Sequence, residues 1–351
     1  MRSSLCQDQP CRPGELPSAG AERTTKSEVI QLIDVKDPKG INHGVRLVEV
    51  SDAESGQRLD NYLLRVLNGV PKTRIYKAVR KGEVRINKGR AKPETKLQAG
   101  DSVRIPPFQE AVKSAPKAAS HHWVARLGAS VVLETDQLLV INKPSGLAVH
   151  GGSGVNAGLI ETLRLMYPEQ RYMELVHRLD RDTSGLIMIA KRASLLRDLH
   201  AQLRGGRIDK RYQALVIGRW PAHLKRIDAP LEKFSLPSGE RRVKVSGEGR
   251  RSLTEFRVLR RWTQATLVEA KPVTGRTHQI RVHCRHANMP ILGEQKYETP
   301  ESETLASSLS VPRLFLHAAK LSFDLDGKRQ TLEAPLPADL LEVCERLGPS
   351  L

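Results

Sequence analysis

The chain has 351 residues and a formal net charge of +18 at pH 7, and 39% of its residues are hydrophobic. The length favours two domains, and no apolar run approaches the 18 residues of a membrane-spanning helix. The first 20 residues lack the apolar centre of a secretory signal, so we expect a cytoplasmic location. The positive charge favours a polyanionic partner, either nucleic acid or an acidic membrane surface.

Residues 1–43 are polar, rich in Pro, Gly and Ser, and lack periodicity, so we expect a disordered tail. Residues 44–107 have the pattern of a small α+β domain. Its expected elements are strands over 44–50, 84–87 and 102–105 and helices over 60–67 and 74–81. This order resembles the S4 RNA-binding domain. Residues 58–106 hold 13 lysines and arginines against 4 acidic residues, a net charge of +9.

Basic residues within this domain recur at spacings of three and four, which places them on one face of the second helix. They are Arg74, Lys77, Arg80 and Lys81. A solvated surface is the ordinary reading of such a run. Charges of one sign repel each other, however, unless a partner neutralises them. We therefore expect this face to bind RNA.

The Pro/Ala/Ser-rich stretch that follows predicts a linker over residues 108–128, and a second domain follows over 129–351. Strands are expected over 131–134, 138–142, 173–176, 186–190, 211–217, 254–258 and 265–269, with a helix over 193–203. Strands outnumber helices without a regular βαβ alternation, so the fold class is α+β with a mixed, largely antiparallel sheet. Residues 298–311 are polar and predict a mobile insertion.

Two polar segments of the second domain carry groups suited to chemistry. Residues 177–185 (HRLDRDTSG) set Asp180 and Asp182 among arginines in a turn between two apolar strands. A rigid sheet that ends in such a turn can hold and expose a carboxylate. Residues 274–283 (TGRTHQIRVH) supply Arg276 and Arg281. From the residues alone, neither the choice between the two aspartates nor that between the two arginines is decided.

Together these segments resemble the RluA-type pseudouridine synthases, over roughly residues 58–345, and most closely the branch that acts on large-subunit ribosomal RNA. The resemblance implies a pseudouridine synthase fold, with Asp180 as the catalytic carboxylate and Arg281 as its ion-pair partner. It also implies that Tyr212 stacks on the target base and assists removal of the C5 proton, and that Arg178 helps to flip the nucleotide. Leu316 is implied as the apolar wall of the uracil pocket, although strand alternation allows Leu314 equally.

In these proteins the glycine-rich segment 143–154 edges the active site, and it lacks the spacing of a P-loop. After residues 290–293 the family usually has Asp, where this chain has Glu294. We expect that change to affect loop geometry and substrate fit more than chemistry.

No metal or cofactor is expected. His177, His278 and His283 lack an HExxH or CxxC companion, so we interpret them as structural, hydrogen-bonding histidines. The four cysteines (Cys6, Cys11, Cys284 and Cys344) are expected to be free thiols.

The predicted function is isomerisation of uridines to pseudouridine in 23S, large-subunit ribosomal RNA. The expected enzyme is a cytoplasmic monomer with neither a DNA nor a membrane partner. One alternative is the same chemistry on another RNA, such as tRNA. A second is a non-catalytic RNA-binding factor of ribosome assembly, which would have no need of a carboxylate in an RNA site. The sequence does not identify the target uridines.

Overall fold

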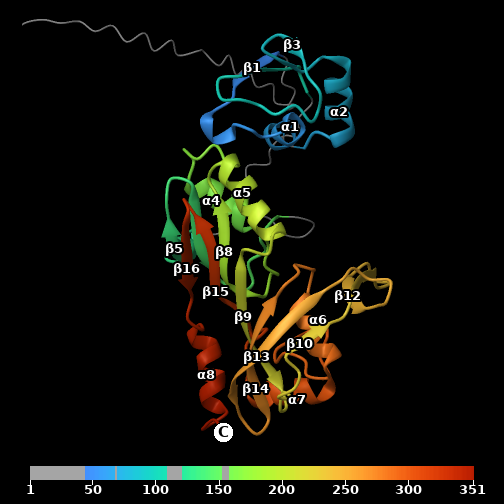
Figure 1. The fold of residues 1–351 in the computed structure, drawn as a ribbon, viewed down its shortest axis with the longest axis vertical. Coiled ribbons are helices and arrows are strands. Elements are labelled where there is room, and N and C mark those ends of the chain that lie inside the picture. Colours follow the sequence, from blue (N-terminus) through green and yellow to red (C-terminus); the bar gives the residue numbers. More distant parts are fainter. Residues whose placement is uncertain (1–43, 68, 109–120, 152–157) are drawn as a thin grey trace, which may run out of the picture. The chain divides into compact units, whose positions relative to one another are not determined.

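The structure is a computed structural model that describes residues 44–67, 69–108, 121–151 and 158–351 (Figure 1). The predicted disordered tail and residues 109–120 of the predicted linker lie outside the described residues. Among the helices that are described, none has the length and apolar character needed to cross a membrane.

The N-terminal unit is a four-stranded antiparallel sheet with two helices, in the strand order β1-β4-β2-β3. A core of its own holds it together, with Leu59, Tyr62, Leu63, Ile75 and Ile105 almost completely buried. Its elements are β1 (Arg46–Glu49), η1 (Asp52–Glu54), α1 (Leu59–Val66), α2 (Lys72–Lys81), β2 (Arg85–Ile86), β3 (Gly89–Arg90) and β4 (Ser102–Ile105).

The helix α2 separates its apolar and basic residues onto opposite faces. Ile75, Ala78 and Val79 are buried in the core. The four basic residues predicted to bind RNA are exposed, and none of them forms an ion pair with a described residue: Arg74, Lys77, Arg80 and Lys81. The helix is therefore amphipathic as the sequence predicts, with a basic outer face.

The second unit is built on a ten-stranded sheet, which runs β10-β13-β14-β9-β15-β8-β6-β5, with β16 paired to β15 and β7 to β8. Every pair is antiparallel except β8 and β15, so the predicted fold class is confirmed. The strands are β5 (Val131–Glu134), β6 (Leu138–Lys143), β7 (Glu174–Leu175), β8 (Ser184–Ala190), β9 (Asp209–Ile217), β10 (Arg226–Asp228), β13 (Leu253–Arg261), β14 (Ala265–Pro272), β15 (Leu316–Leu325) and β16 (Lys328–Glu333). A separate hairpin pairs β11 (Leu231–Ser235) with β12 (Arg241–Val245).

Both faces of the sheet are covered around β8, which explains the unbroken apolar run of that strand. Met188 belongs to a cluster under α5, whereas Ile187 and Ile189 belong to the larger core on the opposite face. The helices of this unit are α3 (His121–Gly128), α4 (Leu159–Met166), α5 (Ala193–Arg204), α6 (Gln279–His286), α7 (Pro300–Ser308) and α8 (Ala338–Arg346). Figure 1 shows α4 and α5 beside the strand β8.

The junction of β8 and β15 requires a glycine. Gly185 has a φ of +111°, and a Cβ atom there would lie within 2.7 Å of backbone atoms of Ala318 on β15. No other residue type allows this close approach in that conformation. The motif glycine therefore lets β8 begin directly after the polar turn that carries Asp180.

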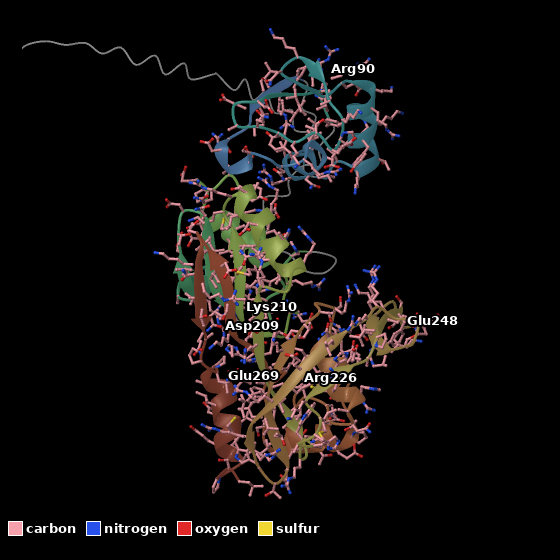
Figure 2. The ribbon with its side chains drawn as sticks, in the orientation of Figure 1. Arg90, Asp209, Lys210, Arg226, Glu248 and Glu269 are labelled. Atoms are coloured by element: carbon pink, nitrogen blue, oxygen red, sulfur yellow. The ribbon has the colours of Figure 1, made fainter. Side chains whose placement is uncertain are left out.

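Strand alternation gives β9 two different faces. Arg211 forms ion pairs with Asp209 and with Glu269 on β14, at 3.0 Å each. Lys210 and Tyr212 point to the opposite side. Figure 2 labels Asp209, Lys210 and Glu269 at this part of the sheet.

Two predictions about connecting segments are wrong. The last eight residues of the predicted linker form α3, and Leu127 of this helix is buried in the core of the second unit. The predicted mobile insertion contains α7, whose N-cap Thr299 accepts a hydrogen bond from the Ser302 amide, with Pro300 in the first turn. Both helices are short, and α7 has small polar residues instead of an apolar stripe, which hides its period.

Candidate active site

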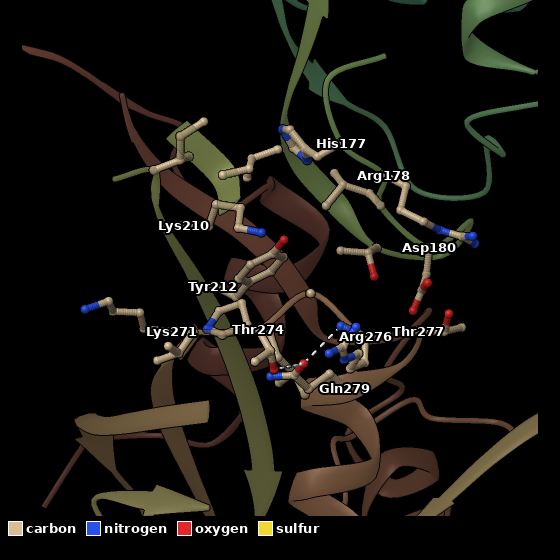
Figure 3. Close-up of a pocket in the computed structure, with 18 of the residues that line it drawn as sticks. His177, Arg178, Asp180, Lys210, Tyr212, Lys271, Thr274, Arg276, Thr277 and Gln279 are labelled. Carbon is tan, nitrogen blue, oxygen red and sulfur yellow. Dashed lines mark hydrogen bonds between the residues drawn. The ribbon is translucent and has the colours of Figure 1, made fainter. Parts of the chain in front are cut away.

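Five of the residues predicted to act on the substrate line one cleft of about 790 Å³ in the second unit (Figure 3). Asp180 and Arg178 lie in the turn before β8, Tyr212 on β9, Arg281 on α6 and Leu316 on β15. The sheet brings together segments more than 130 residues apart in sequence. The four basic residues on α2 belong to the N-terminal unit and do not line this cleft.

Lys143 holds the turn that carries Asp180. Its side chain is completely buried, and its Nζ donates hydrogen bonds to the carbonyl oxygens of Pro144, Leu147 and Arg181 at 2.9–3.0 Å. The backbones of Gly146 and Arg181 are also joined by a hydrogen bond of 2.9 Å. Burial lowers the pKa of Lys143 to about 7, although the charges of Asp182 and Asp180 raise it. In the sequence, the only signal for this role is the position of the lysine before the glycine-rich loop.

Arg281 is the basic group in contact with Asp180. Its Nη1 lies 3.3 Å from Asp180 Oδ2, whereas the exposed Arg276 donates to the carbonyl oxygen of Arg251. Asp182 is more exposed and lines a neighbouring depression instead of the cleft. Of the alternatives left open by the sequence, the geometry therefore favours Asp180 and Arg281.

Glu294 fixes the orientation of Arg281. Its two oxygens accept hydrogen bonds of 2.6 Å from Nε and Nη2 of the arginine, and both side chains are almost fully buried. Burial by itself would lower the pKa of Arg281, but the hydrogen bonds and charges of Glu294 and Asp180 raise it. Glu294 also accepts a hydrogen bond from the Lys296 amide. From the sequence, Glu294 is expected to affect loop geometry and substrate fit more than chemistry, but in the structure this carboxylate also holds Arg281, the partner of Asp180.

His278 is the second group that faces Asp180. Its Nε2 lies 3.9 Å from Asp180 Oδ2, and its Nδ1 lies 2.6 Å from the hydroxyl of Tyr297. Burial lowers the pKa of His278 and so favours its neutral form, although the charge of Asp180 acts in the opposite direction. The residue sits at the N-cap of α6 with a left-handed φ of +52°. The Tyr297 hydroxyl also accepts from the Val243 amide, which connects the cleft to the β11–β12 hairpin.

Tyr212 and Leu316 form an apolar wall beside these charges. Both are more than 90% buried. They lie on adjacent antiparallel strands, where Leu316 is opposite Ala214 and Ala318 is opposite Tyr212. Burial first, and then the charge of Asp180, raise the pKa of Tyr212, so its phenol stays protonated at neutral pH. Leu314 lines the neighbouring depression, so the geometry favours Leu316 for the wall of the cleft.

The remaining histidines make the structural hydrogen bonds that the sequence predicts. His177 Nε2 accepts from the Met188 amide, and His283 contacts the Thr254 hydroxyl and the Ala229 carbonyl. Cys284 and Cys344 are free thiols, whereas Cys6 and Cys11 lie outside the described residues. Among the residues that the structure describes, no group of three or more His, Cys, Asp or Glu side chains is placed to hold a metal ion.

We expect activity to survive chelation. EDTA should leave conversion of an RNA substrate unchanged in a monovalent-salt buffer in which the RNA stays folded, since the two carboxylates that line the cleft, Asp180 and Glu255, are paired with Arg281 and Lys271. RNA folding should be checked in parallel by its melting profile. Loss of turnover that Zn²⁺ alone restores would contradict this expectation.

Comparisons with known proteins identify the family and the fold. Residues 137–286 match the family described as RNA pseudouridylate synthase, and residues 57–103 match the S4 domain. The chain is 51% identical over 318 residues to the ribosomal large subunit pseudouridine synthase C of Haemophilus influenzae, covering 90% of this chain and 99% of that protein. It is 50% identical over 308 residues to the protein of the same name from Escherichia coli K12, covering 86% and 97%.

A solved structure supports the same fold. The human protein RNA pseudouridylate synthase domain containing 4 aligns with a TM-score of 0.53 at 24% identity, over 64% of this chain and 95% of that one.

Proposed function

The chain belongs to the RNA pseudouridylate synthase family, and from this premise we propose that it isomerises specific uridines of 23S, large-subunit ribosomal RNA to pseudouridine. The observation that carries the proposal is the carboxylate of Asp180, held 3.3 Å from Arg281 at the wall of a cleft that also contains Tyr212. The substrate class follows from the relatives, which are named ribosomal large subunit pseudouridine synthases and match almost end to end.

The reaction breaks the N1–C1′ bond, turns the uracil and joins C5 to C1′, without net oxidation or reduction. It requires a carboxylate at the junction of sugar and base, and Asp180 takes this position in the proposal. Arg281 orients the carboxylate of Asp180 through a charge-assisted hydrogen bond. Arg281 is itself held in place by Glu294.

The other cleft residues bind the nucleotide. A target uridine must leave the helical stack, at a cost of a few kcal/mol. The exposed Arg178 at the cleft has a planar guanidinium that can fill the vacated stack. Tyr212 would stack on the base and assist removal of the C5 proton, while Leu316 forms the apolar wall of the uracil pocket.

The basic face of α2 supplies affinity for structured RNA in this proposal. An alanine variant at all four basic positions should bind RNA more weakly: Arg74, Lys77, Arg80 and Lys81. The slope of the logarithm of its binding constant against the logarithm of salt concentration should become less steep, by about 0.7 per lost phosphate contact on single strands. Conversion at saturating RNA should be preserved, because the cleft residues lie in the other unit. Affinity against salt concentration and single-turnover conversion measure the two effects separately.

A matched control replaces basic residues whose charge is already paired. Lys320, Arg329 and Arg346 form ion pairs with acidic side chains. Their replacement by alanine should change the salt slope much less. A slope that is unchanged in the α2 variant would place the RNA-binding surface on the second unit.

Two other functions predict different outcomes. The same chemistry on tRNA would appear as faster conversion of unmodified tRNA than of unmodified large-subunit ribosomal RNA. A non-catalytic assembly factor would convert neither. The pairing of a carboxylate with a held arginine argues against the binder, since a carboxylate repels phosphate and adds nothing to affinity. Initial rates on the two RNAs, with pseudouridines mapped in each, distinguish the three functions.

The proposal also states that the enzyme is a monomer and acts in the cytoplasm. The enzyme needs neither a DNA nor a membrane partner. Sedimentation of the protein with and without its RNA tests the oligomeric state.

A further inference from the structure

Lys210 is a cation without an anionic partner in the wall of the cleft. Within the described part of the chain, no carboxylate lies within ion-pairing distance of its ammonium group, and no hydrogen bond satisfies it. Its neighbour Arg211, on the other face of β9, has both Asp209 and Glu269 as partners. Enclosure by the protein lowers the pKa of Lys210. A half-buried ammonium without a counter-charge favours a ligand that supplies negative charge.

The surroundings of Lys210 also lack negative charge. His177 lies close enough for Lys210 to affect its titration, and burial together with this positive charge lowers the pKa of His177 to about 3. The ring is therefore neutral. Because Nε2 accepts the Met188 amide, the proton is on Nδ1, which is buried and has no partner. Two donors without acceptors thus lie at the same part of the cleft.

Lys210 lies beside Tyr212 in the cleft, on the side away from Asp180 (Figure 3). Lys210 precedes Tyr212 by two residues, so both side chains leave β9 on the same face. Figure 3 shows Lys210 and His177 on one side of the Tyr212 ring, with Asp180 across the cleft. The charge of Asp180 also raises the pKa of Tyr212, and both side chains line the same cleft. A base held against Tyr212, with its sugar at Asp180, would have Lys210 at its far edge.

We propose that Lys210 binds the oxygen-bearing edge of the target uracil and stabilises the negative charge that the base acquires when its bond to the sugar breaks. This inference rests on the proposed function. On cleavage of N1–C1′ the electron pair stays with the uracil and spreads over N1, O2 and O4. The new C5–C1′ bond then takes an electron pair from the ring, the C5 proton leaves and N1 gains a proton. Lys210 neither gains nor loses a proton overall.

Stabilisation of this kind acts on rate more than on affinity. The negative charge exists only once the glycosidic bond has begun to break, so the ammonium interacts more strongly with the transition state than with the bound uridine. A second effect is retention, because a charged base that is held by Lys210 is less able to leave before it turns.

The test compares single-turnover conversion by the full chain and by Lys210→Met, which keeps length and removes charge. We expect the rate at saturating RNA to fall about 100-fold, the scale seen when one donor to a developing negative charge is removed. RNA affinity should change little.

Lys210→Arg, which restores a cation, should recover part of the rate. Lys271→Met is the matched control, because Lys271 lines the same cleft but pairs with Glu255 at 3.2 Å, and its effect should be much smaller.

A substrate change identifies what Lys210 contacts. RNA with 5-fluorouridine at the target carries a base whose anion is more stable, since fluorine withdraws electrons. The Lys210→Met defect in cleavage of the glycosidic bond should therefore be clearly smaller with this RNA than with uridine. An equal defect with both substrates would overturn the proposal.

A weakened affinity with a flatter salt slope and a normal rate would also overturn it, and would assign Lys210 to a backbone phosphate. Unfolding midpoints of the variants, measured in urea, separate these outcomes from misfolding. If the wild-type chain converts no RNA, the proposed function fails. If the wild type converts RNA and Lys210→Met converts it equally fast, only this inference fails.

Discussion

Replacement of Asp180 by asparagine should abolish conversion of uridine while RNA affinity stays within about threefold of the wild type. Asparagine keeps the shape of the side chain and loses its charge and nucleophilicity. The hydrogen bond from Arg281 can still form to the amide oxygen, so the cleft should keep its geometry. Single-turnover assays at saturating RNA, with pseudouridine quantified after nuclease digestion, measure the effect.

Asp182→Asn is the control for this prediction. Asp182 is close in sequence and shares the same turn, but it lines the neighbouring depression. The Asp182→Asn variant should retain most of the wild-type activity. If Asp180→Asn still turned over within about tenfold of the wild type and Asp182→Asn did not, the catalytic role would belong to Asp182.

Replacement of Glu294 by alanine should have the largest effect on stability. It leaves the guanidinium of Arg281 buried and removes two of its three hydrogen bonds, so that only the bond to Asp180 remains. Loss of one partner of such a pair destabilises a fold by about 3–5 kcal/mol. Urea unfolding should show a lower midpoint, and conversion should fall as well, because Arg281 would no longer be held against Asp180.

Two further variants serve as a control and as a partial rescue for Glu294→Ala. Glu342→Ala removes one partner of an exposed ion pair with Arg346, and should cost only a small fraction of that stability. Glu294→Asp restores a carboxylate with a shorter reach, so it should recover part of both stability and rate. Normal stability and normal rate in Glu294→Ala would contradict the proposed support of Arg281.

The sequence predicts the sheet well where burial imposes a strong pattern. The strand β8 is apolar throughout because both of its faces are covered, and the hairpin of β5 and β6 has clear alternation and a short turn. The basic face of α2 is visible because its charges share one sign and one helical period. Short helices with weak apolar stripes, such as α3 and α7, lack these signals, so the sequence predicts a linker and an insertion in their place.

The family resemblance predicts the residues that line the cleft, but not the residues that hold them in position. Asp180, Arg281 and Tyr212 come from three distant segments, and only the fold brings them to one cleft. Lys143 and Glu294 were missed as supporting residues for a physical reason. A buried charge is normally disfavoured, so a sequence pattern suggests exposure unless the partner is known. For Lys143 the partners are backbone carbonyls, which leave no trace in side-chain composition.

A site-resolved map of pseudouridines in unmodified large-subunit ribosomal RNA, after incubation with the purified chain, tests the central claim most directly. The account predicts nearly complete conversion at a few defined uridines by the wild type, without an added cofactor, and at none of them by Asp180→Asn. A map that is identical with and without the wild-type protein, from RNA that the protein demonstrably binds, would contradict it.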